Sequence, residues 1–387
     1  MAKPVVVIGA GLAGISAALH LEKSNREVIV LESSDRAGGR VATDRIDGYL
    51  CDRGFQLINS KYPALQELDV IKEIDFITAP RIIEVAMGTA HFTLGDPRVS
   101  PWSALDRATG TLPEKLALIR YLLTKSDSSK SLGEELRAAG TGNLYSRVLE
   151  PFLTGVFLAS PERVDAIYGK SVIKSFVSGS PGVPRLGVGE LSTALSARLK
   201  DLRLGNRVEA IRGSVVETNN GSIEASQIIV ATDATTASQL LDLRDIPALV
   251  GCTTWYHSVD STSRNARLII DGQGRGPVMN SLAISKISSS YAPAGKDLIS
   301  TTTPLSITES ETRRHLSILW GSDTRDWELV AKYEIPSALP LQSVGRALTQ
   351  KIAVRDNIYC IGDHRSTPSQ QGALFSGRLA AQLILNK

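Results

Sequence analysis

Apolar runs alternate with a glycine-rich turn at the start of the chain. Residues 4–8 are apolar without a polar break, which predicts a buried strand. The stretch 12–22 predicts a helix, and the apolar run 27–31 predicts a second strand. A strand, a helix and a strand in this order are typical of a parallel βαβ unit. We therefore expect an α/β fold that contains a doubly wound parallel sheet.

The turn between the first strand and the helix carries a G-x-G-x-x-G pattern at Gly9, Gly11 and Gly14. The first two glycines allow a tight turn close to a pyrophosphate, and the third lets the helix pack closely on the strand. The helix start points its amides and its positive dipole end at phosphates. Glu32 ends the second strand 18 positions after Gly14, near the roughly 20 expected for a carboxylate that binds ribose hydroxyls. This context favours dinucleotide binding over a glycine-rich turn without a ligand.

The residues that follow Glu32 indicate which dinucleotide is bound. Residues 32–40 resemble the E-x-x-x-R-x-G-G-R signature of the flavin-containing amine oxidoreductase superfamily, which includes monoamine oxidases, protoporphyrinogen oxidases and carotenoid desaturases. The resemblance implies a Rossmann-like domain that binds FAD. Ser34 stands where the family often has an arginine, so one phosphate contact is expected to be weaker. The residues that the resemblance places beside the pyrophosphate and flavin are Arg36, Gly38, Gly39 and Arg40.

The end of the chain carries a second pattern of the same superfamily. A predicted strand at 357–361 precedes a G-D…G-A-x-x-S-G-x-x-A-A sequence, which resembles the C-terminal FAD signature. The resemblance implies that Asp363 accepts a ribityl hydroxyl, that the next helix presents its first amides to the flavin, and that a short strand contacts the adenine through Val208. Residues 372–377 contain no cysteine, so we expect FAD to be held non-covalently. The residues assigned from this pattern are Gly362, Asp363, Gly372, Ala373 and Leu374.

The middle of the chain predicts a second, interleaved domain. Runs at 82–86 and 90–94 predict a hairpin, and stretches within 252–287 predict a mixed, largely antiparallel sheet. We expect an α+β substrate-binding domain from these strands and the helices between them. The FAD-binding domain is expected to comprise residues 1–60, 185–242 and 341–387, and the substrate-binding domain residues 61–184 and 243–340.

One predicted helix and this sheet are expected to form the walls of a substrate pocket. In the stretch 112–123, Leu116, Ile119 and Leu123 recur at helical spacing, which predicts a core-facing side. We expect this helix and the 252–287 sheet to roof a pocket over the flavin. Its expected lining is mostly apolar: Leu116, Trp255, Tyr256 and Met279.

Composition and charge argue against several other classes of function. The net charge is only +3 and no dense Lys/Arg run occurs, so nucleic-acid binding is not supported. The three cysteines lie far apart and have no metal-binding spacing, which also favours a reducing, cytoplasmic compartment. The apolar stretch 4–19 is too short to span a membrane, so we expect no transmembrane segment, although peripheral membrane contact stays open.

The expected reaction is hydride transfer from a small, largely apolar, isoprenoid- or carotenoid-like substrate to flavin N5. Residues 52–56 and 362–365 resemble the phytoene dehydrogenase-like branch of the superfamily. The alternatives are an amine or porphyrinogen-type FAD oxidase and a non-enzymatic binder of prenylated ligands on the same fold. Hydride transfer needs no dedicated base, so His364 and Lys286 are only candidates, and simple structural roles are favoured for both. The sequence leaves the electron acceptor open.

Overall fold

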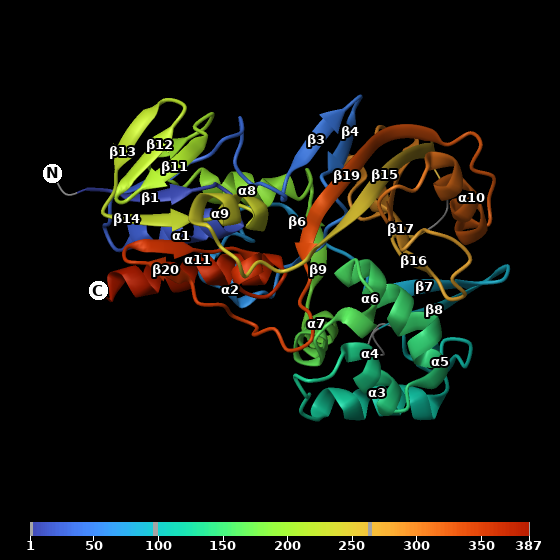
Figure 1. The fold of residues 1–387 in the computed structure, drawn as a ribbon. Helices are drawn as coiled ribbons and strands as arrows, with labels where there is room; N and C mark the ends of the chain where they lie inside the picture. The colour runs from blue at the N-terminus through green and yellow to red at the C-terminus, as the bar shows by residue number, and fades with distance from the viewer. Residues whose placement is uncertain (1–2, 96–99, 262–264, 387) are drawn as a thin grey trace.

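The computed structural model describes residues 3–95, 100–261 and 265–386. Figure 1 shows two large sheets side by side, with a layer of helices below the second. The N-terminus and the C-terminus lie close together at the outer end of the first sheet (Figure 1). The two ends of the chain therefore build the same part of the molecule.

The first sheet has six strands in the order β10-β2-β1-β14-β21-β20. All neighbours are parallel except β20 and β21. The chain order reverses between β1 and β14, and ligands of such sheets bind at the carboxyl ends of the strands near this point. The bounds are β1 (Val5–Ile8), β2 (Val28–Leu31), β10 (Leu202–Arg203), β14 (Gln227–Val230), β20 (Ala353–Arg355) and β21 (Ile358–Cys360).

Both faces of this sheet are covered, which explains why its strands are apolar throughout. Val5 and Val7 of β1 pack on the face that carries α1 (Leu12–Lys23) and α11 (Gln370–Leu385). The alternate residues of β1 pack on the other face, against α9 (Ala234–Leu241) and the sheet of β11 (Val208–Arg212), β12 (Val215–Thr218) and β13 (Gly221–Glu224). These observations confirm the expected doubly wound α/β architecture.

The second sheet has seven strands in the order β19-β15-β18-β17-β16-β7-β8. Its neighbours are antiparallel except β16 and β7, and α10 (Glu309–Trp320) covers one face. The stretch 252–287 is not strand to its end, because a 3-10 helix at Ile284–Lys286 follows β17. The bounds are β7 (Ile82–Met87), β8 (Ala90–Gly95), β15 (Leu249–Asp260), β16 (Leu268–Asp271), β17 (Asn280–Ala283), β18 (Lys296–Thr303) and β19 (Glu328–Pro340).

The helical layer comes from the chain between β8 and the return to the first sheet. The helix predicted at 112–123 forms as α3, but its apolar side faces outward, so the expected core packing of Leu116, Ile119 and Leu123 is wrong. The element bounds are η1 (Pro101–Leu105), α3 (Leu112–Leu123), α4 (Leu132–Ala138), α5 (Gly142–Leu144), η2 (Tyr145–Leu149), α6 (Glu150–Phe157) and α7 (Ala166–Ser178).

Short elements connect the two large sheets. The strands of the first sheet come from residues 1–60, 185–242 and 341–387, and those of the second from 61–184 and 243–340. Among the described residues, no helix is both long enough and apolar enough to cross a membrane. The connecting elements are β3 (Thr43–Ile46), β4 (Tyr49–Asp52), β5 (Ile58–Asn59), α2 (Pro63–Leu68), β6 (Phe76–Thr78), β9 (Pro181–Pro184) and α8 (Gly189–Ser196).

Candidate cofactor and active site

The three glycines after β1 serve different purposes. A Cβ on Gly14 would lie 2.0 Å from the Gly9 carbonyl oxygen, so this position must be glycine for α1 to start where it does. Gly9 has a φ of +102°, which favours glycine because it has no Cβ. Gly11 is different, since its φ is −74° and a Cβ there would meet nothing within 4 Å. The fold does not require glycine at position 11, which suits a position that a ligand approaches.

The second pair of glycines lies directly against this turn. The Gly38 amide donates to the Ala10 carbonyl at 2.8 Å, and Gly38 forms a parallel bridge with Gly11. Gly39 has a φ of +58°, and a Cβ on it would lie 3.7 Å from the Gly11 Cα. The two motifs therefore form one glycine-lined cradle at the start of α1, and this cradle fits a pyrophosphate.

Glu32 is held in place at the end of β2 by the turn around it. Its Oε2 accepts the Ala10 amide at 2.9 Å, and its Oε1 accepts both the amide and the hydroxyl of Ser34 at 2.9 Å. A carboxylate offers about four acceptor positions, so capacity remains for a ribose hydroxyl. The Asn206 amide donates to the Glu32 carbonyl at 2.8 Å, which places the start of β11, at Val208, nearby.

The two arginines of the first signature have different partners. Arg36 donates to the Asp44 carboxylate at 2.7 Å, so the structure commits it to the β3–β4 hairpin. Arg40 donates to Asp363 at 2.7 Å and to the Ala338 carbonyl at 2.7 Å. The Asp363 carboxylate raises the pKa of the Arg40 guanidinium above its usual value. Arg40 thus joins both cofactor signatures to the end of β19.

The start of α11 corrects the expected roles of Gly372, Ala373 and Leu374. The helix begins at Gln370, and Ser369 accepts the Gly372 amide on its hydroxyl and the Ala373 amide on its carbonyl. The amide of Leu374 lies inside the helical hydrogen-bond ladder. The amides at the very start of the helix belong to Gln370 and Gln371, two residues upstream of those expected. Gly372 is needed for packing, because a Cβ there would lie 1.9 Å from the Thr367 carbonyl oxygen.

Two glutamines that were not among the expected site residues connect the first signature to the start of α11. Gln56 donates to the Arg40 carbonyl at 2.8 Å, and Gln370 donates to the Gln56 side chain at 3.2 Å. The Gln370 Oε1 is buried and has no hydrogen-bond partner among the described residues. A buried acceptor without a partner is costly, so a donor from a bound ligand would stabilise it. In the sequence, Gln370 could have been selected because it directly follows Ser369, a residue type that often caps a helix start.

The two candidate catalytic residues take structural positions. His364 is buried, its Nε2 lies 3.5 Å from the Cys360 Sγ, and burial lowers its pKa to about 4. Lys286 binds Asp297 at 3.0 Å and Ser261 at 3.3 Å, beyond the far end of β15. Arg40 contacts Ala338, which lies near the start of β15. Along the strand, that point is roughly 30 Å from Lys286. Lys286 is therefore not a flavin-site lysine.

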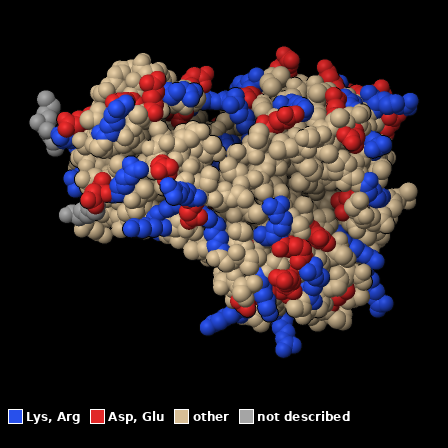
Figure 2. Space-filling view, viewed as in Figure 1, with Lys and Arg blue, Asp and Glu red and all other residues tan. Residues whose placement is uncertain are grey.

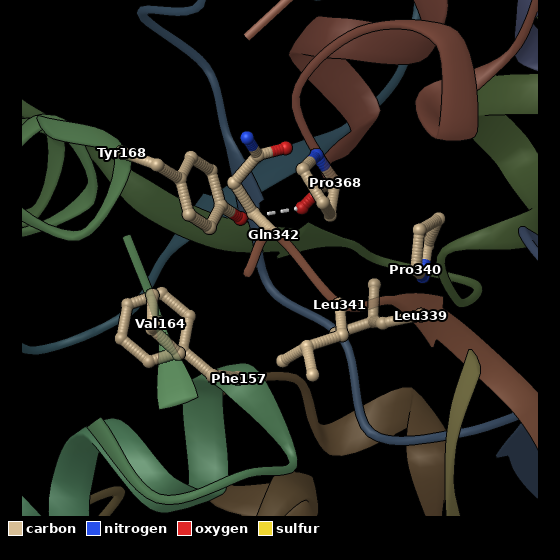
Figure 3. Close-up of a pocket in the computed structure, with 8 residues that line it drawn as sticks. All are labelled: Phe157, Val164, Tyr168, Leu339, Pro340, Leu341, Gln342 and Pro368. Carbon is tan, nitrogen blue, oxygen red and sulfur yellow. Dashed lines mark hydrogen bonds between the residues drawn. The ribbon is translucent and has the colours of Figure 1, made fainter. Parts of the chain in front are cut away.

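A small hollow lies beside the cofactor residues, between α6, α7, the end of β19 and the segment before α11 (Figure 3). The space in it open to a water-sized molecule is about 10 Å³, room for about one water, so in this conformation the hollow is closed to a substrate. Tyr168 crosses it and donates to the Pro368 carbonyl at 2.8 Å (Figure 3). No lining side chain is charged. The lining residues are Phe157, Val164, Tyr168, Leu339, Pro340, Leu341, Gln342 and Pro368.

The expected pocket lining is wrong in two respects. Leu116 lies on the outer surface of α3. Trp255 and Tyr256 point to opposite faces of β15, as neighbouring strand residues do. Trp255 donates to the Thr303 hydroxyl on the α10 side, whereas Tyr256 donates to the Asp52 carbonyl on the other side. The two aromatic side chains cannot line one pocket.

Known proteins are similar to this chain in sequence or in fold. Protoporphyrinogen oxidase of Nicotiana tabacum chloroplasts is 24% identical over 307 residues, which cover 65% of this chain and 55% of that protein. The chain thus spans about half the length of this curated relative. A putative protoporphyrinogen oxidase from Exiguobacterium sp. 255-15 has the same fold, with a TM-score of 0.75, 18% identity and full coverage of both chains. A putrescine oxidase variant also superposes over both full chains, with a TM-score of 0.72 and 15% identity.

The sequence model of the family described as flavin containing amine oxidoreductase matches residues 12–385. This match includes Glu32, both arginines of the first signature and the whole C-terminal signature. It confirms the expected cofactor, FAD held without a covalent bond, and the glycine cradle, Glu32 and Gln370 provide groups that fit it. The relatives do not single out the phytoene dehydrogenase-like branch. The chain belongs to the flavin-containing amine oxidoreductase family.

Proposed function

We propose that the protein is an FAD-dependent oxidoreductase that takes hydride from a C–H bond of a largely apolar substrate. The carrying observation is the hollow beside Pro368, whose lining contains apolar side chains, one tyrosine and one glutamine but no charge (Figure 3). An ammonium group entering this hollow would lose water without gaining a carboxylate partner, which is costly. The lining therefore favours an apolar substrate, such as the isoprenoid-like compounds expected from the sequence, over an amine.

The chain's own residues would bind the FAD, orient the substrate and shield both from water. FAD supplies the hydride acceptor when it is bound. The glycine cradle at Gly11 and Gly39 would receive its pyrophosphate, and Glu32 its ribose. The helix dipole at the start of α11 favours negative charge near Gln370 and Gln371. The apolar lining of the hollow would exclude water and contact an apolar substrate that opens it, and positioning alone supplies a large share of rate acceleration.

Porphyrinogen oxidation is the second candidate. It is favoured by the names of two relatives, one of which matches 65% of this chain in sequence. A porphyrinogen also offers C–H bonds on a large and mostly apolar ring, so the same lining would suit it. A non-enzymatic role as a binder of prenylated ligands is disfavoured because both cofactor signatures are intact.

We also propose a reducing compartment, such as the cytoplasm, with peripheral contact to a membrane. All three cysteines lie on strands, and all three are buried and unpaired. Unpaired buried thiols are typical of reducing surroundings. The membrane contact is argued in the next subsection.

Anaerobic mixing of the yellow holoprotein with isoprenoids, porphyrinogens and simple amines tests the substrate class. We expect the visible flavin absorbance to fall with an isoprenoid or a porphyrinogen and to stay with amines. A matched pair of variants on β19 sharpens the result. Leu339→Asp places a carboxylate in the hollow and should slow reduction about tenfold or more, whereas Leu329→Asp lies on the exposed part of the strand and should not. Fast bleaching by amines alone would overturn the proposal.

A further inference from the structure

The outer side of α3 carries an apolar stripe that no described part of the chain covers. Leu112, Leu116, Ile119 and Leu123 lie within about 60° of one another around the helix axis, since each residue turns the helix by about 100°. Leu116 is 55%, Ile119 56% and Leu123 83% exposed. Tyr121 is buried on the opposite side of this helix, and Leu118 and Leu122 also pack against the core. The stripe is therefore the side of α3 turned away from the protein.

The neighbouring element extends this apolar surface. The 3-10 helix η1 contacts α3, and Lys115 of α3 donates to the Asp106 carbonyl just after η1 at 2.6 Å. Trp102 and Leu105 of η1 are also exposed, Trp102 by 80%. Exposed apolar residues that occur singly are normal, but a contiguous patch marks a surface that meets an apolar partner. We call these six residues of η1 and α3 the α3 surface.

Basic side chains border the α3 surface. Arg120 lies about 40° around the helix from Leu116, and Lys125 follows the helix end. Residues 105–130 contain five basic and three acidic residues, and Glu114 is occupied by the capping hydrogen bonds of α3. Figure 2 shows that the side chains that project furthest beyond the lower edge, where Figure 1 places α3, are basic. The patch is apolar at its centre and positive at its rim.

We propose that the α3 surface docks the protein on an anionic lipid bilayer. An amphipathic helix lying in the plane of the interface buries its apolar side at the acyl boundary and contacts headgroups with its basic residues. Tryptophan is enriched at this depth because its ring is amphipathic, and Trp102 has that position. Pairing of two copies is less suited, because the rim of the second copy is basic as well and offers Arg120 and Lys125 no negative partner. This inference does not depend on the identity of the substrate.

Vesicle flotation of the full-length holoprotein tests the surface. The vesicles are phosphatidylcholine alone or phosphatidylcholine with about one third phosphatidylglycerol. We expect binding to the anionic vesicles, and weaker binding at high salt. Ile119→Glu together with Leu123→Glu should lower the partition coefficient about 100-fold, taking about tenfold for each lost apolar side chain. Arg120→Gln with Lys125→Gln should lower it about tenfold on anionic vesicles only.

Ile318→Glu is the matched control, because it makes the same replacement at an exposed position of α10. It should bind like the unmodified protein. Flavin content and thermal midpoint of all variants show that each remains folded. The proposal is overturned if the unmodified protein floats with neither kind of vesicle, or if the Glu variants bind as it does. It is also overturned if the protein is a dimer that these variants make monomeric without any vesicle binding, since the α3 surface would then be an interface between copies.

Discussion

The helices α11 and α3 have the same apolar periodicity and opposite surroundings. In α11, Ala380, Ala381 and Ile384 are buried against the six-stranded sheet and α1. Helices α11 and α1 approach each other so closely that a Cβ on Gly377 would lie 2.2 Å from the Ala13 carbonyl oxygen. In α3, the corresponding stripe faces outward. Periodicity therefore identifies one side of a helix, but it does not say what covers that side.

The two helices are also stabilised in different ways. Thr111 and Glu114 form a capping box at the start of α3, and Tyr121 anchors it to α4 by donating to Glu135 at 2.8 Å. The inner side of α3 packs on the core through the partly buried Leu118 and Leu122 and the buried Tyr121, so the helix is held without burying its outer stripe. By contrast, α11 is held by burial along its length. We expect mutations of equal size to have very different effects in the two places.

The largest effect is expected where α11 meets α1. Gly377→Val would place a side chain against the backbone of α1 and should lower the free energy of unfolding by more than about 3 kcal/mol, because neither backbone can yield cheaply. Flavin should be lost as well. Ala117→Val adds the same side chain to α3 and should cost only about 0.5 kcal/mol, the difference in helix propensity. Urea unfolding of both variants measures this contrast, and equal losses would contradict it.

A matched pair of isoleucines gives the next largest effect. Ile384→Ala removes a buried side chain from α11 and should cost about 2–5 kcal/mol, whereas Ile119→Ala on the exposed side of α3 should cost less than about 0.5 kcal/mol. The reason is that only the first change leaves a cavity. If Ile119→Ala destabilises the purified protein as much as Ile384→Ala does, the stripe on α3 is covered in solution.

Asp52 lies where the two halves of the molecule meet and should make stability depend on pH. Its Oδ2 accepts the Tyr291 hydroxyl at 2.7 Å, and burial raises its pKa to about 6. The unfolded value is about 3.9, so the folded protein binds this proton more tightly. The contribution of Asp52 to stability therefore falls by up to about 3 kcal/mol as pH rises from about 4 to about 6.

Asp52→Asn removes this titration while keeping the side-chain shape. The stability of the variant relative to the unmodified protein should rise across that pH range, by up to about 3 kcal/mol. Urea unfolding at a series of pH values gives the difference curve, in which other carboxyl groups cancel. A flat difference curve would mean that Asp52 titrates normally in the folded protein.

The smallest expected effect is on cofactor affinity at the end of β2. Glu32→Ala should weaken FAD binding by about 1.5–3 kcal/mol, the usual contribution of charge-assisted hydrogen bonds. Gly11→Ala should also weaken binding but leave the stability of the apoprotein unchanged, since a Cβ there meets nothing within 4 Å. Titration of apoprotein with FAD measures both. Full flavin occupancy of Glu32→Ala after purification would rule out the ribose contact.

Contacts between residues close together in the chain account for the features that could be predicted. The strand, turn and helix at the start of the chain, the hairpin around Gly88 and the helix at Leu112–Leu123 form as expected. Each has a local physical cause, such as an apolar run, a glycine with positive φ or a cap. The two signature motifs were recognisable for the same reason, because short backbone turns that approach a ligand demand glycine at fixed spacings.

The surroundings of these elements depend on contacts between distant parts of the chain. Arg40 and Asp363 are 323 positions apart, and Tyr168 and Pro368 are 200 apart, yet each pair forms a hydrogen bond in or beside the candidate site. The same packing commits Arg36 to Asp44, moves the first amides of α11 to Gln370 and Gln371, and turns the apolar stripe of α3 outward. A local pattern specifies how the chain bends and which side of it is apolar. The partner of that side depends on contacts between distant segments, which no short stretch of sequence contains.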